Sequence, residues 1–165
     1  MGRVGGVTEG SAAGMKLWEK VELSKLVIDH AIRSSRRVFA SCSFGKDSRV
    51  LIDLAMQVEP RLLFVGIDTG YEFAETLLFA DALVRETGMN LSWARPPERD
   101  RKNIEAAFGD SMIRDGHYKC CEMKAPALAP LLGEYDAWIT GLRRDENEFR
   151  RNTPIVDSGK IAKVN

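Results

Sequence analysis

The residues best suited to chemistry lie between an apolar run, Val38–Ala40, and residues 50–58, whose apolar side chains recur at helical spacing. The connecting octet is Ser41-Cys42-Ser43-Phe44-Gly45-Lys46-Asp47-Ser48. Backbone N–H groups at the start of a helix lack intrahelical partners, and the helix dipole adds partial positive charge there. A strand, a tight loop and a helix in this order therefore predict a site for phosphate or sulfate. An ordinary capped turn is the alternative.

Individual residues of the octet suit an anion. Gly45 would let the backbone turn sharply and approach a ligand, and Lys46 would add a full positive charge. Asp47 or Ser48 would cap the helix. The spacing excludes two better-known loops. The pattern of a glycine, four intervening residues and then Gly-Lys-Ser/Thr is absent, and so are the three spaced glycines of the dinucleotide fingerprint.

The composition is that of one soluble domain. The 165 residues are 44% hydrophobic and 29% charged, and 24 basic residues balance 24 acidic ones. We therefore expect no global attraction to nucleic acid or to an anionic membrane. Neither a membrane-spanning run nor a signal core is present, and the cysteines number only three, which favours a reducing cytoplasm.

Apolar periodicity predicts alternating strands and helices. We expect a flexible tail over residues 1–14 and a single domain over residues 15–165. Predicted helices cover 16–34, 50–58, 72–87, 103–108 and part of 118–132, with Gly88 as a C-terminal cap. Predicted strands cover 37–43, 61–67, 90–94 and 135–140. This order predicts an α/β fold, with a parallel twisted sheet flanked by helices on both faces.

Four polar loops follow the predicted strands, at residues 43–48, 68–71, 95–102 and 141–151. In a parallel sheet the carboxyl ends of the strands share one edge, and ligands bind beyond that edge. The last loop carries Arg143, Arg144 and Arg150, whose planar guanidinium groups suit phosphate or sulfate oxygens. Pairing with acidic neighbours at the surface is the alternative for each arginine. Asp68 would either cap a helix or contact a ribose hydroxyl.

These segments carry a family resemblance. The octet resembles the Ser-Gly-Gly-Lys-Asp-Ser loop of the adenine nucleotide alpha hydrolase superfamily, and its Ser-Phe-Gly is most similar to the sulfonucleotide reductase branch. Residues 68–76 resemble that branch's Asp-Thr-Gly-Tyr segment and the helix start that follows it. Residues 137–150 resemble its Gly-Leu-Arg-Arg segment, with Glu146-Asn147 where Gln-Ser is usual.

The resemblance implies a Rossmann-like three-layer fold and the reduction of adenylyl sulfate, or its 3′-phosphorylated form, to sulfite and an adenosine nucleotide. Thioredoxin or glutaredoxin would be the reductant. Whether the chain forms a homo-oligomer is not decided by the resemblance. The expected nucleotide site comprises Ser41, Ser43, Phe44, Gly45, Lys46, Asp47, Ser48, Asp68, Thr69, Gly70, Lys124, Gly141, Arg143, Arg144 and Arg150.

The adjacent pair Cys120-Cys121 resembles the tandem cysteines that ligate a [4Fe-4S] cluster in the adenylyl sulfate branch. Such a cluster takes four ligands, and the later Cys-x-x-Cys of that branch is absent here, so two of the four are visible. Cys42 is expected to be a buried strand residue. Lys124 resembles the family's lysine near cluster and substrate, although it comes one residue early.

The family's nucleophilic cysteine belongs to a C-terminal segment that we expect this chain to lack. Two hypotheses follow. The chain is the nucleotide-binding portion of a sulfonucleotide reductase, or it is a non-reducing relative that binds ATP or an adenylate as an adenylating or regulatory module. Under the first hypothesis we expect binding without turnover, since none of the three cysteines is expected to be both exposed and mobile.

Overall fold

The computed structural model describes residues 14–114, 117–158 and 161–165. The tail predicted over residues 1–14 lies, apart from Gly14, outside the described residues. The helices are α1 Leu17–Ser34, α2 Lys46–Val58, α3 Ala74–Thr87, α4 Glu98–Phe108 and α5 Lys124–Glu134, with short 3-10 turns η2 Gly109–Ser111, η3 Lys119–Met123 and η4 Glu148–Arg150. The strands are β1 Val38–Cys42, β2 Leu63–Ile67, β3 Asn90–Ala94, β4 Ile113–Arg114, β5 His117–Tyr118, β6 Ala137–Ile139, β7 Val156–Ser158 and β8 Ala162–Val164.

Six of the described strands form one sheet in the order β3-β2-β1-β6-β8-β7. Neighbouring strands from β3 to β8 run parallel, whereas β7 pairs antiparallel with β8 at one edge. The parallel sheet predicted from the sequence is confirmed. The edge hairpin of β7 and β8 was not predicted.

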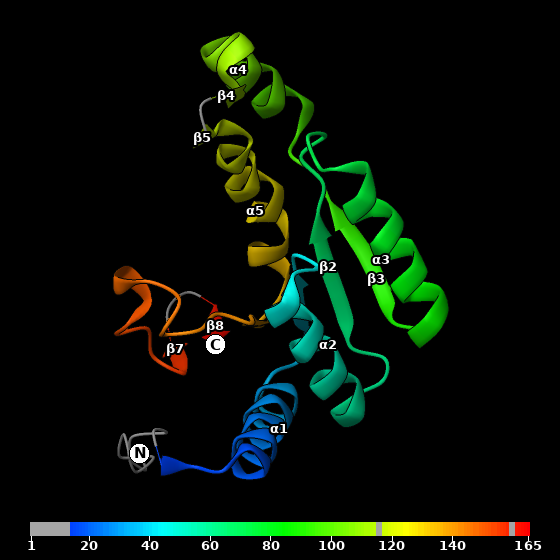
Figure 1. The fold of residues 1–165 in the computed structure, drawn as a ribbon, viewed down its shortest axis with the longest axis vertical. Helices are drawn as coiled ribbons and strands as arrows, with labels where there is room; N and C mark the ends of the chain where they lie inside the picture. Colours follow the sequence, from blue (N-terminus) through cyan, green and yellow to red (C-terminus); the bar gives the residue numbers. More distant parts are fainter. Residues whose placement is uncertain (1–13, 115–116, 159–160) are drawn as a thin grey trace.

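Helices lie on both faces of this sheet (Figure 1), and buried apolar residues form a core on each face. Successive residues of a strand point to opposite faces. Ala40 of β1 packs with residues of α1, α2 and α3, whereas Phe39 packs with Leu128 of α5 and stacks on Trp138. Cys42 is buried on the Ala40 side, as predicted. The predicted three-layer arrangement is therefore confirmed.

Several helix bounds differ from those predicted. Helix α2 begins at Lys46 rather than near residue 50, because the polar end of the octet forms its first turn. Helix α4 begins at Glu98, five residues before the predicted start, with acidic residues in its first turn, where they favour the dipole. Gly88 adopts φ 68° after α3, so its predicted role as a left-handed cap is confirmed.

Helix α1 has 18 residues, with charged side chains between its apolar ones. Among the residues with described positions, no helix combines the length and the apolar character that a bilayer span requires.

Candidate anion-binding site

The site is built around the start of α2, where the loop of residues 43–48, here called the anion loop, leaves β1. Gly45 is the N-cap residue, and no side chain caps the helix. The first turn of the helix therefore keeps backbone N–H groups free for a ligand. The prediction that Asp47 or Ser48 caps the helix is wrong, because both residues lie inside its first turn.

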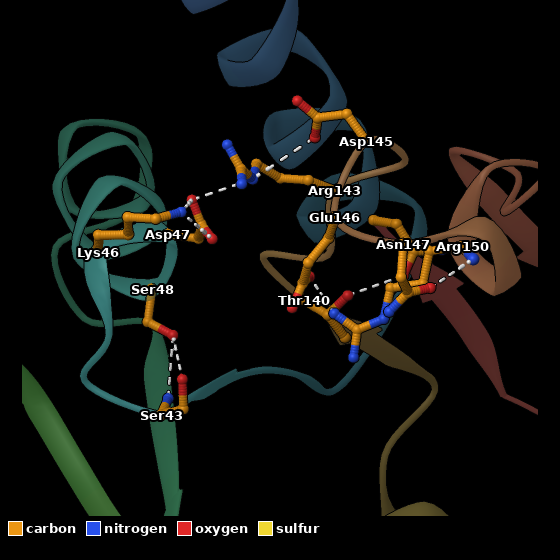
Figure 2. Close-up of polar contacts among 11 residues, drawn as sticks. Ser43, Lys46, Asp47, Ser48, Thr140, Arg143, Asp145, Glu146, Asn147 and Arg150 are labelled. Carbon is orange, nitrogen blue, oxygen red and sulfur yellow. Dashed lines mark hydrogen bonds and ion pairs between the residues drawn. The ribbon is translucent and has the colours of Figure 1, made fainter.

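Two serines fix the shape of the anion loop. The backbone N–H of Ser43 donates to Oγ of Ser48 at 3.0 Å, and the two hydroxyl oxygens are also 3.0 Å apart. Ser48 is buried, whereas Ser43 is exposed. The Ser48 hydroxyl therefore closes the loop onto the helix, and the hydroxyl groups of Ser43 and Ser48 face each other beside the helix start (Figure 2).

The sharp turn of the loop lies at Phe44 rather than at Gly45. Phe44 has φ 60°, in the left-handed region, while Gly45 has an extended backbone with φ −74°. The predicted turning role of Gly45 is therefore wrong. A Cβ added at Gly45 would contact only Oγ of Ser43, at 3.7 Å, so the fold itself has room for a larger residue there.

Two cations from distant segments meet at this helix start. Nζ of Lys46 lies 3.0 Å from a carboxylate oxygen of Asp47, and Nε of Arg143 lies 3.2 Å from the other (Figure 2). Arg143 also lies 3.6 Å from Asp145. A Cβ at Gly141 would lie 3.3 Å from the backbone oxygen of Asp47, so the glycine permits this close approach. The Asp47 carboxylate thus forms ion pairs with both cations.

The other two predicted arginines are held by their own segment, residues 141–151, here called the arginine loop, and the turn that follows it. Nε of Arg144 donates to the carbonyl of Thr153 at 2.7 Å. Arg150 forms an ion pair with Glu146, and its backbone N–H donates to Oδ1 of Asn147 at 3.0 Å. The alternative of pairing with an acidic neighbour is therefore what the structure contains for Arg150, with Glu146, and for Arg143, with Asp145.

The loop after β2 lies at the same carboxyl edge of the sheet. Oδ1 of Asp68 accepts the N–H of Gly70 at 2.9 Å, and Oδ2 accepts Nε of Arg95 at 2.9 Å. Gly70 has φ 84°, and the hydroxyl of buried Thr69 donates to Glu72. Asp68 therefore does not cap α3, whose N-cap residue is Phe73. The Arg95 partner was not predicted, although its place just after β3 was a usable signal.

Two predicted residues lie apart from this cluster. Ser41 is in β1, and its hydroxyl accepts the indole N–H of Trp138 at 2.8 Å. Lys124 begins α5, and its charge offsets only part of the rise that burial causes in the pKa of the Cys120 thiol. The structure thus brings together Ser43, Phe44, Gly45, Lys46, Asp47, Ser48, Gly141 and Arg143.

The cysteines do not form a complete cluster site. Cys120 is half-buried and Cys121 exposed, both in η3, while Cys42 is buried in β1, where burial raises the pKa of its thiol to about 12. Burial, followed by the neighbouring Cys121, also raises the pKa of Cys120. Within the described ranges, no group of three or more His, Cys, Asp or Glu side chains is arranged to hold a metal ion. Two adjacent thiols alone do not fit a cubane, which takes four ligands.

Comparisons with known proteins agree on one family. Residues 37–163 match the family model described as phosphoadenosine phosphosulfate reductase domain. An adenosine 5′-phosphosulfate reductase of Geobacillus thermodenitrificans is 34% identical over 154 residues, covering 85% of this chain and 65% of the relative. One from Rhodococcus opacus is 37% identical over 120 residues, covering 70% of this chain and 48% of the relative.

The solved structures give the same fold. A phosphoadenylyl-sulfate reductase from Candida auris, crystallised as a phosphate complex, matches with a TM-score of 0.66 at 16% identity, over 92% of this chain and 79% of that chain. The present chain spans about two thirds or less of the curated relatives described above. Because the family model covers most of its length, the chain belongs to the phosphoadenosine phosphosulfate reductase domain family.

Proposed function

We propose that this chain binds adenosine 5′-phosphosulfate, or its 3′-phosphorylated form, and supplies the nucleotide site of a sulfonucleotide reductase of cytoplasmic sulfate assimilation. The reaction would release sulfite and an adenosine nucleotide. The observation that carries the proposal is the uncapped start of α2, with Lys46 and Arg143 beside it. The names of the relatives, adenosine 5′-phosphosulfate reductase, support the substrate class.

Different loops would contact different parts of the ligand. The phosphosulfate would lie against the first turn of α2, where Ser43, Gly45 and Lys46 offer N–H, hydroxyl and ammonium donors. Arg143, Arg144 and Arg150 would close over it from the arginine loop. The nucleoside would extend toward the loop at 68–70, which lies at the same sheet edge. The phosphate complex of the Candida auris relative supports an anion site in this fold.

Reduction at sulfur needs a thiolate that reaches the substrate. Cys42 is unsuited to this role, because a pKa of about 12 leaves roughly one thiol in 10⁵ ionised at pH 7. The pKa of Cys120 is raised as well, mainly by burial. Cys121 is exposed, and we assign it, together with Cys120, to a cluster. We therefore expect this chain to bind the nucleotide without turning it over, with thioredoxin or glutaredoxin as the reductant of the complete reaction.

A cluster at Cys120 and Cys121 belongs to the same proposal. These two thiols would be half of its ligands, and two more would have to come from residues other than Cys42. Elemental analysis for iron tests this assignment. The chain, prepared anaerobically with iron and sulfide, should contain less iron than one cubane per chain, and Cys121→Ser should lower its iron content further. Iron content unaffected by that change would contradict the assignment.

Titration calorimetry with adenosine 5′-phosphosulfate, its 3′-phosphorylated form, AMP and ATP tests the binding. We expect a sulfonucleotide to bind more tightly than ATP, and no sulfite to be released with thioredoxin and reductant present. Preference for ATP would favour the adenylating or regulatory module instead. Sulfite at an ordinary enzymatic rate, on the order of 1 per second or more, would show that one of these three cysteines is the nucleophile.

A further inference from the structure

Phe44 has a backbone conformation that its side chain disfavours. Among the residues the structure describes, it is the only one other than glycine with a positive φ, at 60°. In the left-handed region Cβ approaches the following carbonyl oxygen, which makes this conformation unfavourable for L-residues. The superfamily loop that the octet resembles has glycine at this position. Some other contact must therefore hold Phe44 in place.

The contact is an aromatic pair above a glycine. The ring of Phe44 lies against the ring of Trp93, with centroids 5.4 Å apart and planes tilted by 40°. Gly66 lies between β1 and β3, in register with Cys42 on one side and Trp93 on the other. A Cβ at Gly66 would lie 2.6 Å from the Trp93 ring and 3.1 Å from Cε2 of Phe44. Both rings thus occupy the space that a side chain at Gly66 would fill.

The position of Phe44 couples this packing to the ligand. Its neighbours are Ser43, whose N–H donates to Ser48, and Gly45, the N-cap of α2. If Phe44 relaxed to a negative φ, the chain would leave the loop in another direction and the Ser43 to Ser48 bond would break. The N–H groups at the start of α2 would then lose the side chains that frame them.

We propose that Trp93, seated over Gly66, is a positioning residue that holds Phe44 left-handed and so keeps the anion loop ready to bind. The proposal rests on the proposed function for its ligand. Trp93 acts on the loop through Phe44, because its contact with the loop is the packing of its ring against the Phe44 ring. A glycine at position 44 would need no such support, because glycine enters the left-handed region readily.

A double-mutant cycle tests the proposal. Trp93→Ala should weaken binding of adenosine 5′-phosphosulfate about tenfold, equivalent to about 1.4 kcal/mol. In the Phe44→Gly background, whatever affinity that variant has by itself, adding Trp93→Ala should change the affinity by less than about twofold. Trp93→Phe should retain affinity. Trp18→Ala serves as the matched control, because Trp18 is exposed on α1. Circular dichroism checks folding, and Trp93→Leu replaces the alanine variant if that one unfolds.

Amide hydrogen exchange without ligand gives a second readout. The Ser43 amide should exchange at least severalfold faster in Trp93→Ala than in the original chain. The proposal would be overturned if Trp93→Ala cost the same affinity in the original chain and in the Phe44→Gly variant, or if it left affinity and exchange unchanged. If the original chain bound no sulfonucleotide, the proposed function would fail, while the exchange rates would still decide whether Trp93 holds the loop.

Discussion

The anion loop and the arginine loop face the same site but are held in different ways. The anion loop is fixed by the Ser43 to Ser48 bond, by the packing of Phe44 against Trp93 and by the start of α2, and it keeps N–H donors free. In the arginine loop, Arg143 and Arg150 are each paired with carboxylates, and Arg144 donates to a backbone carbonyl. One side is preformed, whereas the other must exchange partners when an anion arrives.

This difference separates two kinds of contribution to affinity. Donors in a preformed loop lose little freedom on binding, so their removal is felt almost in full. An arginine that leaves a carboxylate gains only the difference between two charged contacts. We therefore expect changes in the anion loop to have the larger effects, and loss of an internal carboxylate to tighten binding.

The largest effect is expected from Gly45→Val. A branched side chain at the N-cap would cover the N–H groups of α2, while the fold has room for the added Cβ. Losing two backbone bonds to a charged group, each about 1.5 kcal/mol, predicts roughly a 100-fold weaker affinity. Calorimetry measures the affinity, with Gly14→Val as control, since a Cβ at Gly14 has no described atom within 4 Å. Unchanged affinity would place the ligand elsewhere.

A smaller loss is expected from Arg143→Ala. Arg143 pairs with Asp47 in the first turn of α2, but it would give up Asp47 and Asp145 to reach the ligand. We expect about a tenfold weaker affinity, near the lower limit for one bond to a charged group. Arg33→Ala is the control, because Arg33 is an exposed arginine of α1 paired with Asp29. A loss as large as that of Gly45→Val would show that the arginine loop is preformed too.

The two loops also differ in how far the sequence predicts them. The anion loop follows from neighbours in the chain, since an apolar strand, a glycine, a lysine and a helical pattern lie within one short segment. The left-handed Phe44 could not be predicted, because its support comes from Trp93 on another strand. The pairing of Arg143 with Asp47 likewise depends on β1 lying beside β6.

The C-terminal hairpin illustrates the same limit. Strands β7 and β8 have three residues each and carry Asp157 and Lys163 opposite one another. So short a segment with interspersed charges has no period that marks a strand. Its pairing is specified by β6, which offers a free parallel edge to β8. The local sequence pattern thus predicts helices and strands whose apolar residues recur at a regular period. Short strands such as β7 and β8 are specified by their tertiary contacts instead.

Removing the Asp47 carboxylate, which pairs with both Lys46 and Arg143, should tighten binding. Asp47→Asn frees Lys46 and Arg143 together and takes one negative charge away from the anion. We expect about a threefold tighter affinity, the range of a partly exposed ion pair. Asp53→Asn is the control on the same helix, where the Asp53 carboxylate accepts a hydrogen bond from Gln57. Weaker binding by Asp47→Asn would mean that the carboxylate aims Arg143 rather than competing with the ligand.

The smallest effect is expected within the arginine loop, at Glu146. Its carboxylate pairs with Arg150, so Glu146→Gln should release that guanidinium and tighten binding about twofold. Glu148→Gln provides a close control, because it removes the same charge two residues away, from a side chain paired at 4.0 Å with Arg151. If removing any nearby negative charge were enough, the two variants would gain the same affinity, and 1 M salt would erase both gains by screening.

If Arg150 exchanges Glu146 for the ligand, Glu146→Gln should gain more affinity than Glu148→Gln at low salt. Titrations of both variants at two ionic strengths decide between these accounts. Equal gains would mean that Arg150 stays paired within its loop while the ligand binds to the anion loop alone.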